Sequence, residues 1–105
     1  VVGEVNTVGV NQIKGRTNGL ALLGHYPNPA SEKININYAL DKNTDVVNLR
    51  IFDLQGRTIF ETNEIHALSG KHAFAINIDG FSQGEYFYTI TGENAKISST
   101  FSIIK

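Results

Sequence analysis

The stretch KININYAL, residues 33–40, shows the clearest pattern in the sequence, because its apolar residues recur at every second position. These residues are Ile34, Ile36, Tyr38 and Leu40. Successive side chains of an extended backbone point to opposite faces, so a period of two indicates a strand with one buried face. The stretch therefore predicts a β-strand, and the same test applied outward from it locates the others.

Six further stretches have the features of strands. They are residues 20–24, 46–54, 57–61, 71–79, 85–91 and 95–105. The alternation slips near Asp53, where the second face of its strand also carries apolar side chains. Across the seven predicted strands, alternation assigns to the core the residues Ile34, Ile36, Leu49, Ile51, Phe74, Ile76, Tyr86, Tyr88 and Phe101.

The segments between the strands are short and contain turn residues. Residues 41–45 and 92–94 predict turns, and Gly56 lies where a tight hairpin requires a positive φ. Only residues 61–70 form a connection long enough to cross between two sheets. No stretch shows a sustained helical period, and seven short strands at this spacing predict an all-β fold, a seven-stranded antiparallel immunoglobulin-like β-sandwich.

Composition and charge limit the size of the fold and the classes of partner. A chain of 105 residues corresponds to one domain. A formal charge of -1 leaves no basic field for a nucleic-acid backbone or an anionic membrane, so no nucleic-acid partner is predicted. No apolar run approaches the ~20 residues that span a bilayer.

The first nineteen residues differ from the rest of the chain. Residues 1–19 carry four of the ten glycines, contain no aromatic residue and follow neither apolar period. We therefore expect a linker here, with a short strand at residues 1–5 that two copies could exchange to form a homodimer. The packed domain is expected to cover residues 20–105. Because the sequence contains no Met, we interpret the chain as part of a longer protein.

Residues that could support catalysis or metal binding are scattered. Cysteine is absent, which excludes thiolate metal sites and a cysteine nucleophile. His25, His66 and His72 lack metal-ligand spacing and are interpreted as structural or surface residues. Asp41 and Asp45 bracket a turn, where Asx hydrogen bonding is the simpler explanation and a calcium ion the alternative. No nucleophile elbow or glycine-rich phosphate loop is present, so no catalytic residue, cofactor or metal ligand is predicted.

Three consecutive aromatic residues place rings on both faces of one predicted strand. They are Tyr86, Phe87 and Tyr88. One face is expected to belong to the core. For Phe87, on the other face, we expect cover by a neighbouring loop or by the linker, with a sugar-stacking or protein-binding surface as the alternative.

Five motifs, in order along the chain, resemble those of type IX secretion system C-terminal sorting domains. HYPNPASEKININYAL, residues 25–40, resembles the opening of the family, with a Tyr-Pro-Asn-Pro turn followed by an alternating strand. VNLRIFDLQGRTI, residues 47–59, is similar to its strand that ends in an aromatic-Asp-x-x-Gly-Arg hairpin. GKHAFAINI (70–78), QGEYFYTI (83–90) and FSIIK (101–105) resemble the Gly-x-His strand, the Gly-x-Tyr strand and the short apolar ending with Lys.

The resemblance implies roles for two groups of residues. The motif residues that shape the fold are Pro27, Asn28, Pro29, Asp53, Gly56, Arg57, Gly70, Gly84 and Tyr86. The candidate recognition residues of a sorting signal are Lys96, Ile103, Ile104 and Lys105. The family often has a Lys shortly before its final apolar pair, whereas Thr100 and Phe101 stand there in this chain.

The two ends of this resemblance carry structural expectations. The two prolines fix φ on either side of Asn28 and predict a turn that sets how the linker enters the sandwich. If Ile103 faces the core, Ile104 is exposed beside Lys105, on an edge strand that could pair with a receptor strand. The alternative is that a neighbouring segment buries Ile104.

The resemblance also implies a sorting signal rather than an enzyme. Family members follow a secreted cargo domain and direct it from the periplasm across the outer membrane of a Gram-negative bacterium. The implied partners are the attached N-terminal cargo, the outer-membrane translocon and shuttle protein, and a sortase-like peptidase that removes the domain during surface attachment or release. A related immunoglobulin-like repeat occurs in flagellar hook-capping proteins. The alternative function is an accessory module that binds carbohydrate or protein for a secreted enzyme.

Overall fold

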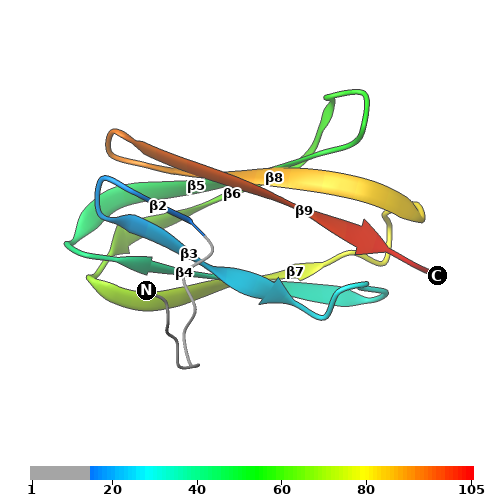
Figure 1. The fold of residues 1–105 in the computed structure, drawn as a ribbon, viewed down its shortest axis with the longest axis horizontal. Helices are drawn as coiled ribbons and strands as arrows, with labels where there is room; N and C mark the ends of the chain where they lie inside the picture. Colours follow the sequence, from blue (N-terminus) through cyan, green and yellow to red (C-terminus); the bar gives the residue numbers. More distant parts are fainter. Residues whose placement is uncertain (1–14) are drawn as a thin grey trace, which may run out of the picture.

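The computed structural model describes residues 15–105. This part of the chain forms two four-stranded sheets packed face to face, and no helix in it is long and apolar enough to cross a membrane (Figure 1). Every pair of neighbouring strands is antiparallel. The predicted antiparallel, immunoglobulin-like β-sandwich is therefore confirmed.

The two sheets draw their strands from different parts of the chain. The first sheet contains, in order, β2 (Gly15–Thr17), β3 (Leu20–Tyr26), β4 (Lys33–Leu40) and β7 (Gly70–Asn77). The second contains, in order, β6 (Thr58–Ala67), β5 (Thr44–Phe52), β8 (Gly84–Gly92) and β9 (Ala95–Ile103). The strands β3 to β9 correspond to the seven stretches predicted from the sequence.

Strand β2 lies inside the stretch that the sequence analysis expects to be a linker. Gly15 pairs with Leu22, and Asn18 and Gly19 form the turn between β2 and β3. Both turn residues have a positive φ, 43° and 86°, the geometry that favours Asn-Gly in two-residue hairpins. The folded part of the chain therefore extends back to Gly15. The strand expected at residues 1–5 lies outside the described residues.

Three connections carry the chain from one sheet to the other, and the prediction that only residues 61–70 could do so is wrong. The crossings join β4 to β5, β6 to β7 and β7 to β8. Most of residues 61–70 belong to β6, and only Leu68 and Ser69 lead to β7. Packed sheets lie about 10 Å apart, a distance that three extended residues can span. Connection length is therefore a poor guide to which segments cross.

The core lies between the inner faces of the sheets, and every residue that alternation assigned to it is buried. Two fully buried tyrosines have bonded hydroxyls: Tyr38 donates to Glu64 Oε1 at 2.6 Å, and Tyr88 Oη lies 2.9 Å from His25 Nδ1. A buried hydroxyl without a partner costs about 1–3 kcal/mol, which these bonds avoid. Burial raises the pKa of Tyr88 to about 12 and also raises the pKa of Tyr38.

Candidate functional site

The segment after β3 lies beside the end of the last strand, β9, although the two are distant in the sequence (Figure 1). After β3 the chain bends, and residues 28–30 run alongside the end of β9 with an isolated parallel bridge between Ala30 and Ile103. We call residues 28–30 together with residues 102–105 the terminal junction. It contains Asn28 and Pro29 of the proline turn and three of the candidate recognition residues, Ile103, Ile104 and Lys105.

Backbone groups and one amide side chain hold the terminal junction together. Ala30 N donates to Ser102 O at 2.9 Å, and Ile104 N donates to Ala30 O at 2.9 Å. The side-chain oxygen of Asn28 accepts a hydrogen bond from Ser102 N at 3.1 Å. Ser102 Oγ also donates to the carboxylate of Glu85 on β8. The amide, the carbonyl and the hydroxyl of Ser102 are thus all bonded.

The proline turn explains why these groups make the contact. Residues 27–29 form bends as the sequence predicts, and the peptide bonds before Pro27 and Pro29 are both cis. The expectation that this turn sets how the linker enters the sandwich is wrong, because the turn joins β3 to β4. Neither proline has an N–H group to donate. The segment therefore reaches β9 through the side chain of Asn28 and the backbone of Ala30.

Lys105 is held by a third segment, the connection between β7 and β8. Its backbone N donates to Gln83 Oε1 at 3.0 Å. Its Nζ donates to the carbonyl oxygens of Ile78 at 3.1 Å and Asp79 at 2.9 Å. An ammonium group has three N–H donors, so these two bonds fix the charge in place and leave one donor for a partner.

Ile103 and Ile104 face opposite ways. Ile103 is 1% exposed and belongs to the core, whereas Ile104 is 56% exposed, so the alternative of a buried Ile104 is wrong. The expected open edge at this end of β9 is also wrong, because Ser102 and Ile104 already bond through their backbones to residues 28–30. A receptor strand could pair here only by displacing that segment.

Two candidate residues lie far from the terminal junction. Lys96 is exposed near the start of β9, opposite Thr91 on β8. At about 3.3 Å per residue, Lys96 lies roughly 30 Å from Lys105. Gly70 begins β7 at the same end of the sandwich, opposite Leu40. The structure therefore divides the candidates between the two ends of the molecule.

The hairpin between β5 and β6 is organised by Asp53. Its Oδ1 accepts hydrogen bonds from Gln55 N at 2.9 Å and Arg57 N at 3.0 Å, and its Oδ2 accepts one from Arg57 Nε at 2.8 Å. Gly56 takes the positive φ, 85°, expected for this turn. Desolvation opposes ionisation, but the bonds from Arg57 and Gln55 outweigh it and hold the pKa of Asp53 below its ordinary value. Asp53, Gly56 and Arg57 therefore shape the turn.

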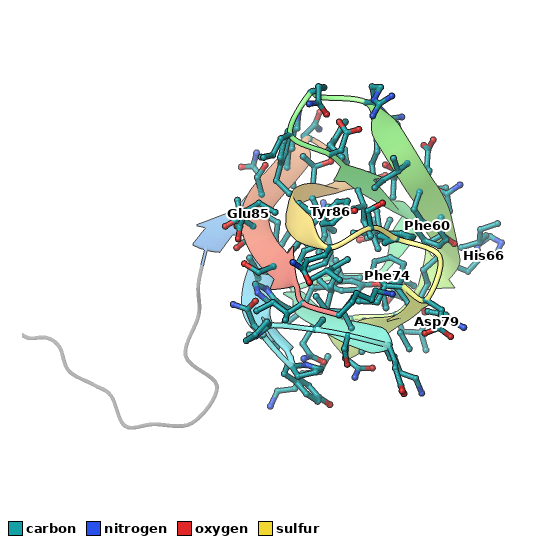
Figure 2. All side chains as sticks on the ribbon, turned by 90° about the vertical axis from the view of Figure 1, so that its right-hand side faces the viewer. Phe60, His66, Phe74, Asp79, Glu85 and Tyr86 are labelled. Carbon is teal, nitrogen blue, oxygen red and sulfur yellow. The ribbon has the colours of Figure 1, made fainter. Side chains whose placement is uncertain are left out.

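A groove of about 370 Å³ opens between this hairpin and the connection from β7 to β8. Its lining includes Asp53, Arg57, Gly84 and Tyr86, four of the motif residues. Gln83, which bonds to Lys105, lines it as well, so the groove adjoins the terminal junction. Figure 2 shows Tyr86 and Glu85 at this end of the sandwich.

Tyr86 has a structural role beneath this groove. Its side chain is buried, and its hydroxyl donates to Ser82 O at 2.6 Å. Its ring lies 5.6 Å from that of Phe81 and 5.7 Å from that of Phe101, measured between centroids. The Gly-x-Tyr motif therefore anchors the connection that in turn holds Lys105.

The histidines are divided among separate structural positions. His72 stacks on Tyr38 with 5.3 Å between ring centroids, and its Nε2 lies 2.6 Å from Leu68 O. Its Nδ1 lies 3.4 Å from Glu64. Within residues 15–105, no three His, Cys, Asp or Glu side chains gather in a way that could hold a metal ion.

Phe87 is half-buried, and its contact is with a neighbouring strand rather than with the expected loop or linker. It lies opposite Phe52 on β5, and the two rings stack with centroids 5.1 Å apart and planes at 17°. The outer face of the second sheet therefore carries one half-buried aromatic pair.

Four residues of the site were absent from the sequence candidates: Ala30, Gln83, Glu85 and Ser102. Each acts through a bond to a segment distant in the chain. Alternation indicates which face a side chain takes but not which distant group it meets. All four lie inside the motifs quoted from the sequence, but those motifs do not indicate which distant group each residue meets.

Comparison with known proteins gives one family. A model described as the secretion system C-terminal sorting domain matches residues 25–105. The match includes both segments of the terminal junction, the Asp53 hairpin and the groove. No curated protein matches the chain.

Proposed function

The chain belongs to the family of secretion system C-terminal sorting domains, and from this membership we propose that the terminal junction is the part that the type IX machinery recognises. Members of the family are sorting signals, so interaction with that machinery and export of the protein follow from membership. In this proposal the domain is a substrate of the machinery and catalyses no reaction itself.

One observation carries the assignment of the signal to the terminal junction. Ile104 is exposed and Lys105 is fixed by three hydrogen bonds, while the neighbouring Ile103 is anchored in the core. An exposed apolar side chain on a bonded backbone, beside a fixed charge, has less conformational entropy to lose when it binds than the same residues on a free chain end. The arrangement supports recognition of residues 103–105 on a folded body.

The finer steps of the proposal follow the family. An attached N-terminal cargo passes from the periplasm of a Gram-negative bacterium through the outer-membrane translocon, with a shuttle protein as a further partner. A sortase-like peptidase then removes the domain upstream of its first strand, and the cargo is attached to the surface or released. We place this cut at or before residue 14, because strand β2 begins at Gly15 and is paired with β3.

A passenger fusion tests the assignment. The passenger carries a signal peptide and ends in this chain, and the host possesses the type IX machinery. Removing residues 103–105 should block delivery to the surface while the fold is kept. The loss of buried Ile103 is about 1.5–3 kcal/mol, and a typical domain has about 5–15 kcal/mol of stability.

Two measurements keep the result interpretable. Circular dichroism on the purified truncated chain reports whether the sandwich persists, and cell fractionation reports where the passenger accumulates. If a folded, truncated fusion reaches the surface at the level of the intact fusion, the sorting assignment of residues 103–105 is wrong. The accessory binding module then becomes the better function.

A further inference from the structure

We infer that Asn28 is a positioning residue of the sorting signal: its side chain keeps residues 102–105 in the arrangement that the machinery recognises. The inference rests on the proposed function and adds a residue far from the signal in sequence. The observation behind it is the bond from Ser102 N to Asn28 Oδ1, which joins residues 74 apart in the chain.

The bond between Ser102 N and Asn28 lies where the pairing of β9 with β8 ends, next to the proposed signal. The pairing of β9 with β8 ends at Ile103, opposite Gly84. The backbone groups of Ser102 face away from β8, toward residues 28–30. Without the Asn28 side chain, Ser102 N has no bond to protein, directly before the proposed signal at residues 103–105.

The remaining contacts form a series that begins at Ser102. Ala30 accepts from Ile104 N, and Gln83 accepts from the next backbone amide, that of Lys105. The bond at Ser102 fixes the backbone direction just before Ile104 and Lys105 make their own bonds. Loss of the Asn28 bond leaves residues 28–30 joined to the end of β9 through the backbone of Ala30, so residues 102–105 are held less firmly although none of their side chains is removed.

The effect on global stability should be small, which separates positioning from folding. Asn28 is exposed, so water can replace its oxygen as the acceptor for Ser102 N. A water molecule satisfies the amide but does not tie it to residues 28–30. Export should therefore fall although the domain stays folded.

Two substitutions of Asn28 and one control test the inference. Asn28→Ala removes the acceptor. Asn28→Asp replaces the amide oxygen by a carboxylate oxygen, which can still accept the hydrogen bond from Ser102 N. The matched control is Asn43→Ala, because Asn43 Oδ1 accepts from Ser69 N at 2.9 Å. That bond is of the same type and lies at the other end of the sandwich, where residue 70 pairs with residue 40.

Hydrogen exchange of the Ser102 amide and surface delivery of the fusion are both measured. In Asn28→Ala, exchange at Ser102 should accelerate about tenfold, as for one lost hydrogen bond, with an unchanged melting temperature. Delivery should fall toward that of the chain lacking residues 103–105. Asn28→Asp and Asn43→Ala should match the parent in both measurements.

The other outcomes separate the two proposals. If truncation blocks delivery but Asn28→Ala does not, the positioning role is wrong and the proposed function stands. If Asn28→Asp protects Ser102 yet fails in delivery like Asn28→Ala, the machinery contacts the amide directly, and positioning is again wrong. If truncation itself leaves delivery unchanged, both proposals fall together.

Discussion

Lys105 offers the sharpest test at the scale of a single residue. Lys105→Ala removes two bonds from Nζ to the carbonyl oxygens of Ile78 and Asp79, together with the charge. Surface delivery should fall several-fold, while the free energy of unfolding changes by less than about 1 kcal/mol. Urea denaturation and cell fractionation measure the two quantities.

The control for this change is Lys71→Ala, another exposed lysine, on β7. It should leave both delivery and stability unaltered. Lys96→Ala adds a test of distance, because Lys96 lies at the far end of β9. Equal loss of delivery in Lys96→Ala and Lys105→Ala would contradict a signal confined to the terminal junction.

Asp53 gives a prediction about pH. Its pKa is lowered from 3.8 in the folded protein, so its ionised form stabilises the fold above that value. This stabilisation disappears as the pH falls through the lower, folded-state pKa. The melting temperature of the parent should therefore exceed that of Asp53→Asn at pH 7, and the difference should shrink below pH 3.8.

Thermal unfolding followed by circular dichroism from neutral to acidic pH measures this difference. Leu54→Ala, in the same exposed hairpin, changes no charge and should show no such pH dependence relative to the parent. If the melting temperatures of the parent and Asp53→Asn differed by the same amount at all pH values, the charge of the carboxylate would not contribute to stability.

At the scale of elements, Tyr38 connects the two sheets. Its hydroxyl on β4 donates to Glu64 on β6, across the sandwich. A hydrogen bond to a charged group contributes about 1.5–3 kcal/mol, so Tyr38→Phe should lower the free energy of unfolding by about that amount. Tyr26→Phe, at an exposed tyrosine, should change it by less than about 0.5 kcal/mol. Equal urea midpoints for Tyr38→Phe and Tyr26→Phe would contradict a stabilising role of the Tyr38–Glu64 bond between the sheets.

Strands with one buried face could be predicted over most of their length, whereas β6 could be predicted only at its start. Residues 33–40 have strict alternation because one face meets the core and the other meets water. In β6 polar residues occupy most positions, since it is an edge strand, and residues 62–67 fall in the stretch expected to be a connection. The Asn18–Gly19 hairpin was also missed, although Asn-Gly is a strong hairpin signal.

The site was predictable only in part, for a physical reason. Alternation placed Ile103 inside and Ile104 outside, because this depends only on neighbouring positions. The partnership of Asn28 with Ser102 depends on how two sheets bring distant segments together. Such a contact has no local pattern in the sequence.

At the scale of the whole molecule, strand β2 limits where the proposed peptidase could cut. A peptidase needs an extended, accessible backbone, and Gly15–Thr17 is paired with β3. We therefore predict that the peptidase cuts at or before residue 14. Mass spectrometry of the released domain measures its first residue. A product that begins within β3 would contradict the boundary.

The bond between Asn28 and Ser102 closes a loop of 74 residues. Closing so long a loop costs chain entropy, and one hydrogen bond cannot offset that cost. The contact forms only when the intervening strands have already brought the segments together. If residues 102–105 are the proposed signal, their arrangement is a checkpoint for complete folding, and an incomplete or misfolded copy lacks it.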